Sequence, residues 1–382
     1  MIMLINKFID CYQLLKKISC QSEKPIFQVF CDFYKLRKKK GIFLDEYRDF
    51  SFSTADVGFI DSFLGLREQI LYLDRLNPVK YYSLARNKYV SHCLLESFGI
   101  KMPRLLGYYH PSTSFDGICN NYSNIKQIIE GLRHYGVHNI VIKTTESSHG
   151  DGVWVIDRIQ YDHCDAVFHL VNDKSIKLSE ILQSREPFLI EERVQQTQQL
   201  SLFNPTSVNT IRFMTTLYPS GEAKIIGAFI KIGRTGSFID NAGSGGNIDA
   251  NINLDTGALE NVIEFNGFDS IRKIEYHPDN GCQLEGMKIE NWEMVKQTIK
   301  KYQQSCPFIK AVGWDVAITD DGPVVIEMND FWDRTGQLFI GKGWRDDIRD
   351  CYLEWGKVAY RPIIERPSSD MSIKMINRII GI

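Results

Sequence analysis

Hydrophobic residues recur at helical spacing in the first part of the chain and at strand spacing in much of the rest. The apolar positions of the first twenty residues follow alternating intervals of four and three: Leu4, Phe8, Cys11, Leu15 and Ile18. This pattern predicts an amphipathic helix at the N-terminus. We expect residues 1–80 to form a mostly helical N-terminal region.

Between residues 81 and 195, short apolar strands alternate with helices. The pattern predicts helices near 85–97, 122–135 and 176–184, and strands at 139–143, 153–157 and 187–191. After Val194 the pattern becomes antiparallel, with two long strands around a turn at 219–222, a short hairpin, and a helix at 288–305.

A second hairpin at 313–330 and a helical last fifty residues complete the expected order. We find no internal repeat and no low-complexity linker, which favours an α+β fold of tightly docked parts. These parts are a helical N-terminal region at 1–80, two lobes at 81–195 and 196–340, and a helical C-terminal tail at 341–382.

Composition narrows the functional class. The 382 residues are 43% hydrophobic, enough for a large core, and the net charge of −2 gives no basic field for nucleic acid. Nine scattered cysteines with no CxxC pair indicate a reduced, cytoplasmic setting and no zinc site. No run of 18 apolar residues is present, and Lys7 and Asp10 interrupt the N-terminal segment, which argues against a signal peptide.

The N-terminal region is locally basic. Residues 1–50 contain ten Lys and Arg against six Asp and Glu, and five of the ten lie in the run KLRKKK at 35–40. A helix beside a basic patch is typical of peripheral contact with the anionic inner face of a membrane. The alternative is a helix packed on the protein with a solvated charge run, and the sequence leaves both open.

The hairpin GWDVAITDDGPVVIEMND carries the first candidate chemistry. Side chains alternate along a strand, so Glu327 and Asn329 share one face, and a three-residue loop at 320–322 would place Asp315 opposite Glu327. Two carboxylates and an amide oxygen suit Mg²⁺ together with substrate phosphates. The alternative is a solvent-facing hairpin whose acids never meet.

The loop at 144–152, TTESSHGDG, follows a buried strand that ends in Lys143. Its glycines permit close approach of backbone amides to a phosphate, and a lysine at the mouth of an apolar strand needs an anion. The ordinary alternative is a flexible turn. Farther on, strand 188–194 ends in acids, and Glu191 could accept a hydrogen bond from an adenine amine, or it could simply lie in solvent.

Taken in order, these motifs resemble the ATP-grasp superfamily. The series comprises Lys88, VIK, SSHGDG, LIEERV, the strand residue Arg212, DN…GG and D…ExN. The stretches NPTSVNTIRFMT, IDNAGSGGNID and GWDVAITDDGPVVIEMN resemble most closely the branch associated with sugar transfer and polysaccharide biosynthesis, over about residues 80–335. The resemblance implies two α+β lobes that grip ATP, with helical additions at both ends.

The resemblance also implies site residues. It implies that the phosphates of ATP contact Lys88, Lys143, Ser148, Gly150 and Gly152. It also implies that adenine contacts Glu191 and the backbone of Arg193 and Val194. One or two Mg²⁺ ions fall to Asp315, Glu327 and Asn329. Arg212 would stabilise the transferring phosphoryl group, and Arg234 and Asn241 would border the acceptor. The glutamate expected on the ribose has no clear counterpart, although Gln198 or Gln199 could replace it.

By this resemblance the expected function is ATP- and Mg²⁺-dependent joining of a carboxylate and an amine into an amide, through an acyl phosphate. One substrate would be a uronic acid or sugar carboxylate of a surface polysaccharide such as a capsule, and the other an amino acid. Two alternatives stay open: a peptide or amino-acid ligase of secondary metabolism, and a non-catalytic ATP-binding module of a glycan assembly complex.

Overall fold

The computed structural model describes residues 2–112, 120–147, 152–162, 164–236 and 246–358. The N-terminal region is helical, as predicted. Its helices are α1 (Ile2–Ser22), α2 (Ile26–Lys40), α3 (Leu44–Asp49), α4 (Val57–Ser62) and α5 (Leu66–Leu76). A 3₁₀ turn (Val79–Tyr81), α6 (Ser83–Arg86) and α7 (Lys88–Ser97) lead into the rest of the chain.

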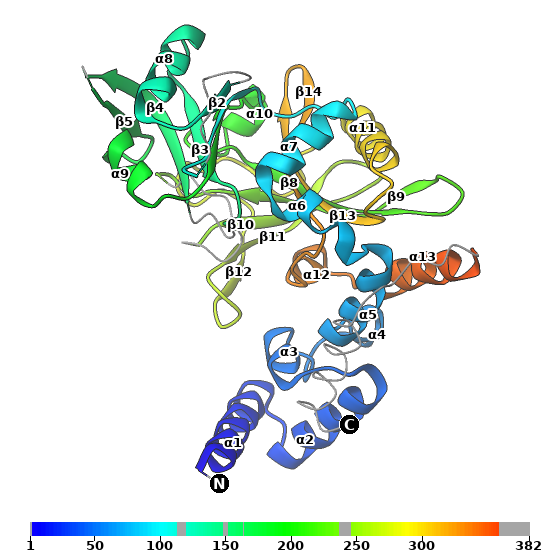
Figure 1. Ribbon diagram of the computed structural model, residues 1–382. Helices are drawn as coiled ribbons and strands as arrows, with labels where there is room; N and C mark the ends of the chain where they lie inside the picture. Colours follow the sequence, from blue (N-terminus) through cyan, green and yellow to red (C-terminus); the bar gives the residue numbers. More distant parts are fainter. Residues whose placement is uncertain (1, 113–119, 148–151, 163, 237–245, 359–382) are drawn as a thin grey trace.

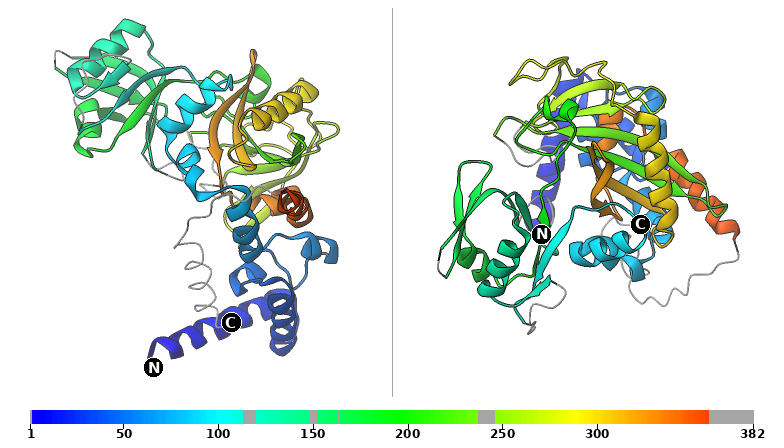
Figure 2. Two further views of the ribbon diagram at one scale, coloured as in Figure 1. Left: turned by 45° about the vertical axis from the view of Figure 1, so that its right-hand side comes forward. Right: turned by 90° about the horizontal axis from the view of Figure 1, so that it is seen from above.

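The first four helices project from one end of the molecule (Figures 1 and 2). They enclose a small core of their own that is rich in aromatic residues, including Phe33, Tyr47, Phe50 and Phe63. Among the helices that the structure describes, none combines the length and hydrophobicity of a membrane-spanning segment.

The first sheet has seven strands in the order β2-β1-β7-β3-β4-β5-β6. Its strands are β1 (Leu105–Tyr109), β2 (Asn121–Tyr122), β3 (Ile140–Thr144), β4 (Val153–Tyr161), β5 (Ala166–Leu170), β6 (Ser175–Lys177) and β7 (Phe188–Glu192). The helices α8 (Ile125–Tyr135) and α9 (Leu178–Gln183) pack on it and share its core. Alternation along β3 buries Ile140 and Ile142 in that core, which leaves Val141 and Lys143 for the opposite face.

The second sheet also has seven strands, in the order β12-β11-β10-β9-β8-β13-β14, and all of its pairings are antiparallel. Its strands are β8 (Thr210–Leu217), β9 (Ala223–Ile232), β10 (Ile248–Ile252), β11 (Leu259–Phe265), β12 (Ile271–Lys273), β13 (Ala311–Thr319) and β14 (Gly322–Asn329). A short helix, α10 (Gln198–Ser201), precedes it.

Helices cover both faces of the second sheet. One face packs against α7 and α11 (Trp292–Ser305), and the other against α5, α12 (Gly336–Ile340) and α13 (Arg345–Lys357). Apolar residues at helical spacing supply the contacts, for example Val295 and Ile299 on α11. The two sheets lie beside each other (Figure 1).

Two differences from the sequence prediction have local causes. The predicted helix at 85–97 is divided because the side chain of Asn87 accepts a hydrogen bond from the Val90 amide and so caps a new helix, α7. The strands β5 and β6 were not predicted, because they are short and one of them, β6, is largely exposed.

One buried side chain connects the N-terminal region to the second sheet. Asn77 is 1% exposed, and its amide nitrogen donates to the Ala311 and Asp330 carbonyls at 2.6 and 2.7 Å. Its oxygen accepts from the Lys310 and Ala311 amides, both at 3.0 Å. The end of α5 is therefore fixed to the start of β13 and to the residue that follows β14.

Candidate functional site

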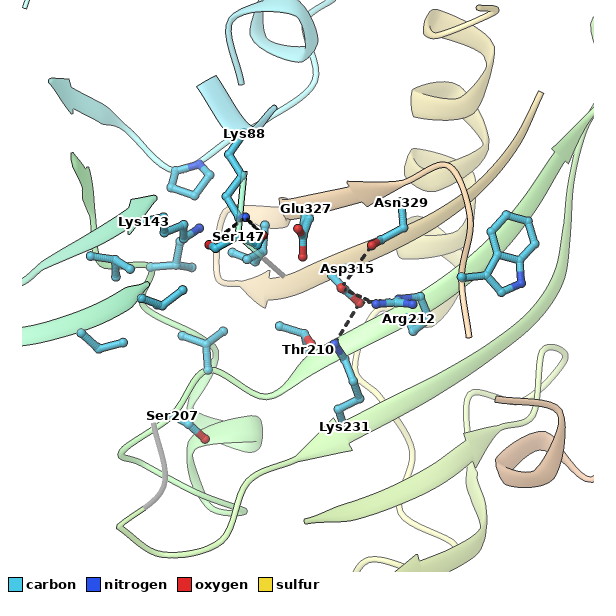
Figure 3. A pocket seen from close by; sticks show the side chains of 18 of the residues that line it. Lys88, Lys143, Ser147, Ser207, Thr210, Arg212, Lys231, Asp315, Glu327 and Asn329 are labelled. Carbon is cyan, nitrogen blue, oxygen red and sulfur yellow. Dashed lines mark hydrogen bonds and ion pairs between the residues drawn. The ribbon is translucent and has the colours of Figure 1, made fainter. Parts of the chain in front are cut away.

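A cavity of about 530 Å³ lies between the two sheets and is lined by residues from both. The first sheet contributes β3, β4 and β7, and the second contributes β8, β9, β13 and β14, while α7 supplies a lysine from above (Figure 3). Apolar side chains line one part of it: Pro103, Val141, Val153, Val155, Val194, Val208 and Ile326. Charged side chains gather in the middle, where the two sheets approach each other.

The predicted hairpin forms, and Asp315 on β13 is opposite Glu327 on β14. The loop is shorter than predicted, because Thr319 pairs with Gly322 and only two residues connect the strands. An uninterrupted register would then place Ile326 opposite Asp315. A β-bulge between the Asp315 and Val316 pairs shifts the register by one residue and brings Glu327 across from Asp315.

Asp315 is 4% exposed and pairs with two cations, one from β8 and one from β9. Its carboxylate accepts from Arg212 Nε and Nη2 at 2.6 Å each, and Lys231 Nζ is 3.0 Å from Oδ1. Burial alone would raise the pKa of Asp315, but Arg212 and then Lys231 hold it well below its usual range. Arg212 and Lys231 are therefore fixed in place in the cavity wall.

Glu327 and Asn329 face the cavity on the same side of β14, as alternation predicts (Figure 3). Asn329 Nδ2 donates to the Gly313 carbonyl at 3.2 Å and approaches Asp315 Oδ2 at 3.5 Å. No hydrogen bond or ion pair joins the Glu327 carboxylate to another of the described residues. Its carboxylate is close enough to Lys88 to act on that amine electrostatically.

The oxygen atoms of Glu327 and Asn329 can bind Mg²⁺ only if other ligands complete its coordination shell. Among the residues that the structure describes, no three His, Cys, Asp or Glu side chains cluster as a metal site. Glu327 and the side-chain oxygen of Asn329 are suitable donors, whereas Asp315 is already neutralised by Arg212 and Lys231. Mg²⁺ commonly takes one or two carboxylates and completes its shell with water and substrate phosphates, so the residues fit such a site.

Two lysines approach the other side of the cavity. Lys143 Nζ is 2.7 Å from Glu191 Oε2, and His92 Nδ1 is 2.9 Å from Glu191 Oε1. Burial opposes ionisation of Glu191, yet Lys143 and His92 lower its pKa below the usual value. Glu191 is 2% exposed, so its carboxylate faces Lys143 rather than the open end of the strand. The predicted contact of Glu191 with adenine stays a prediction, and the structure shows this carboxylate already engaged.

Lys88 begins α7, and its amine donates to the backbone carbonyl and, at 3.4 Å, to the hydroxyl of Ser147. Burial lowers the pKa of Lys88, and the positive charge of Lys143 lowers it further, while Glu327 and Glu191 act in the opposite direction. An anion placed between these two amines would be attracted by both.

The segment after β7 has backbone groups that are available to bind a ligand. The Arg193 amide donates to the Asn139 carbonyl at 3.0 Å. Among the described residues, no hydrogen bond uses the Arg193 carbonyl or the Val194 amide. Both residues line the apolar part of the cavity, where such a donor and acceptor pair matches the edge of a planar heterocycle.

The remaining predicted residues divide into two groups. Ser148, Gly150 and Asn241 lie outside the described residues. Gly152 has a φ of +66°, and a Cβ there would be 2.2 Å from Thr144 Oγ1, so glycine is required at the end of this loop. Arg234 does not line the cavity; its guanidinium pairs with Asp279 and Glu264.

Sequence reasoning missed Lys231 and His92. Lys231 interrupts the apolar stretch at 225–232 in the same way that Lys143 ends an apolar strand, and this signal could have identified it. His92 lies on a helix with no distinctive neighbours in the sequence, so nothing local indicated its contact with Glu191.

The family model for sugar-transfer associated ATP-grasp proteins matches residues 67–351. Among solved structures, a biotin carboxylase from Campylobacter jejuni is 9% identical, with a TM-score of 0.43 over 75% of this chain and 50% of that one. The D-Ala:D-Ser ligase VanG from Enterococcus faecalis is 11% identical, with a TM-score of 0.41 over 71% of this chain and 62% of that one.

The chain thus spans less than two thirds of the length of either enzyme. No curated protein matches the sequence. The family model covers most of the chain, including both sheets and the cavity between them. This protein therefore belongs to the sugar-transfer associated ATP-grasp family.

Proposed function

We propose that this protein is an ATP- and Mg²⁺-dependent ligase that joins a carboxylate to an amine, with ATP cleaved to ADP and phosphate. The observation that carries the proposal is the charged centre of the cavity. Arg212 and Lys231 are fixed by Asp315 on one side, Lys88 and Lys143 lie on the other, and Glu327 has no partner among the described residues. Phosphoryl transfer requires such positioned charge and no protein nucleophile.

In the first step, a carboxylate oxygen of one substrate attacks the γ-phosphorus of ATP. The bond from this phosphorus to the bridging oxygen breaks, so that an acyl phosphate and ADP form. In the second step, the amine nitrogen attacks the acyl carbon, phosphate leaves with the carbon–oxygen electron pair, and the nitrogen loses a proton. The product is an amide.

The residues divide this work by position. Lys88 and Lys143 suit the phosphates of ATP, and the apolar part of the cavity beside Val194 suits adenine. Arg212 and Lys231 suit the transferring phosphoryl group or the oxyanion that forms on the acyl carbon. Glu327 and Asn329 would hold Mg²⁺, which would neutralise phosphate oxygens when bound.

For the substrates, we propose a uronic acid or another sugar carboxylate of a surface polysaccharide, with an amino acid as the amine. This choice is supported by the family, whose description associates it with sugar transfer. The use of ATP and the scattered cysteines support a cytoplasmic reaction.

The test is release of ADP and phosphate from Mg-ATP in the presence of uronic acids and amino acids, singly and in pairs. We expect turnover that requires one of each, and a product lighter than their sum by one water. Glu327→Gln provides the matched inactive control. ATP binding without release of ADP for any pair, including pairs with oligosaccharide acceptors, would contradict ligase activity and favour a non-catalytic module.

A further inference from the structure

The second helix of the N-terminal region exposes a stripe of aromatic residues. Phe27, Phe30 and Tyr34 are 75, 45 and 49% exposed, and their spacing of three and four places them on one face of α2. The adjoining face carries Val29 and Phe33, which are buried in the core of the N-terminal region. The aromatic face therefore plays no part in that core.

Exposed lysines continue the same face. Lys38 follows Tyr34 by four residues, and its amine lies 5.6 Å from the Tyr34 ring centroid. Lys35 follows Cys31 by four residues at the edge of the stripe, and it too is exposed. We call Phe27, Phe30, Tyr34, Lys35 and Lys38 the α2 face.

The lysines of the basic run at 35–40 differ in their surroundings. Lys40 is 4% exposed, and its amine donates to the Ile60 and Asp61 carbonyls at 2.6 and 2.5 Å. Lys39 pairs with the Asp61 carboxylate at 3.1 Å. These two lysines anchor the end of α2 to α4, whereas no ion pair joins Lys35 or Lys38 to another described residue.

The neighbouring helix shows the same combination. On α1, Ile9 and Tyr12 are 47 and 59% exposed, and the exposed Lys16 follows Tyr12 by four residues. α1 and α2 pack together through Leu15, Ile18 and the buried face of α2. This helical pair lies at the end of the molecule opposite the first sheet (Figure 1).

We propose that the α2 face docks on an anionic lipid surface. Aromatic rings beside lysines on a helix suit the boundary between lipid headgroups and acyl chains, where the rings enter and the amines remain with phosphates. Each lysine near such a surface strengthens binding about fivefold. A symmetric dimer through this face would bring two sets of lysines together, so charge favours the lipid over a second copy.

The test is co-sedimentation of the full chain with vesicles of phosphatidylcholine, alone or with about 30% phosphatidylserine. We expect binding to the anionic vesicles only, and release as salt rises from about 0.1 M to about 0.5 M. The double variant Lys35→Gln/Lys38→Gln should bind about 10- to 25-fold more weakly. Phe30→Ser/Tyr34→Ser should bind at least tenfold more weakly.

Two matched controls carry the same changes elsewhere on the surface. Tyr276→Ser removes an aromatic ring that is 54% exposed, and Lys301→Gln removes an exposed lysine of α11. Both should bind like the unaltered chain, and all variants should remain folded with nearly its melting temperature, because none of the replaced side chains is in a buried core.

The proposal is overturned if the unaltered chain does not bind anionic vesicles or binds neutral vesicles equally well. It is overturned as well if the control variants lose as much binding as the α2-face variants. It is also overturned if size-exclusion chromatography shows a dimer that Phe30→Ser/Tyr34→Ser converts to a monomer without any vesicle binding. That result would assign the face to a second copy.

Discussion

Asp315 and Glu327 face each other across one hairpin, and removing either negative charge should have opposite consequences. Asp315→Asn leaves Arg212 and Lys231, whose side chains are 16 and 6% exposed, without their common partner. Breaking a buried ion pair in this way costs about 3–5 kcal/mol of stability. Glu327→Gln breaks no side-chain hydrogen bond or ion pair with a described residue, so the free energy of unfolding should stay within about 0.5 kcal/mol.

Glu327→Gln should lose activity rather than stability. Glu327→Gln removes a donor suited to Mg²⁺ and should lower turnover at least ~10²-fold while the chain remains fully folded. The assay pairs urea unfolding of the free protein with ADP release at saturating Mg-ATP. Asp320→Asn, in the exposed turn of the same hairpin, is the control for removal of a charge and should change neither quantity.

Thermal unfolding with and without Mg-ATP gives an independent measure of binding. A ligand at about 100 times its dissociation constant adds about 2.7 kcal/mol of stability, so loss of this gain in Glu327→Gln would locate the defect in nucleotide binding. If Glu327→Gln is as destabilised as Asp315→Asn, Glu327 has a structural partner and is not a free metal ligand. Full turnover in Glu327→Gln would remove the proposed metal site.

Three further predictions concern stability. The pKa of Asp315 is lowered in the folded state, so its contribution to stability is present above the unfolded pKa of about 3.9 and is lost as pH falls toward the folded pKa. Urea unfolding between about pH 3 and pH 7 should therefore show a smaller loss of unfolding free energy toward acid in Asp315→Asn than in the unaltered chain. Gly131→Ala should lower the stability of the protein by about 1–3 kcal/mol although alanine favours helices, because the added Cβ would be 2.1 Å from the Tyr122 hydroxyl. Gly356→Ala has open space around the added Cβ and should raise the stability by about 0.5–1 kcal/mol, as measured by thermal melts. Asn77→Ala should lose at least about 3 kcal/mol in urea unfolding, since buried backbone groups of β13 lose their partners; a loss below 1 kcal/mol would show that water replaces them.

The fold was largely predictable because its signals are local. Apolar periodicity gave the order of helices and strands, and alternation placed Glu327 and Asn329 on one face of β14. The pairing of Asp315 with Glu327 was also correct, but its cause was not the predicted three-residue loop. A two-residue turn and a bulge produce the same pairing, and the hydrophobic pattern does not distinguish these arrangements.

The partners of the charged residues were not predictable in the same way. Asp315 meets Arg212 from 103 residues away, and Glu191 meets His92 from 99 residues away. Sequence spacing carries no information about such contacts, because they depend on how strands are ordered in a sheet. Glu191 illustrates the consequence: a strand-end acid suited to a ligand is a buried partner of Lys143.

Most of the positive charge in the cavity is held in pairs before any ligand arrives. Asp315 offsets one of the two positive charges of Arg212 and Lys231, and Glu191 offsets that of Lys143. This pairing fixes the cations in position, so little reorganisation is needed when charge develops on a phosphoryl group. Three cations against two carboxylates leave one net positive charge to attract a polyphosphate, and the negative charge of Glu327 cancels it. A divalent cation that arrives with the nucleotide would reverse this balance at Glu327, and for that reason nucleotide affinity should depend steeply on Mg²⁺ in the unaltered chain and weakly in Glu327→Gln.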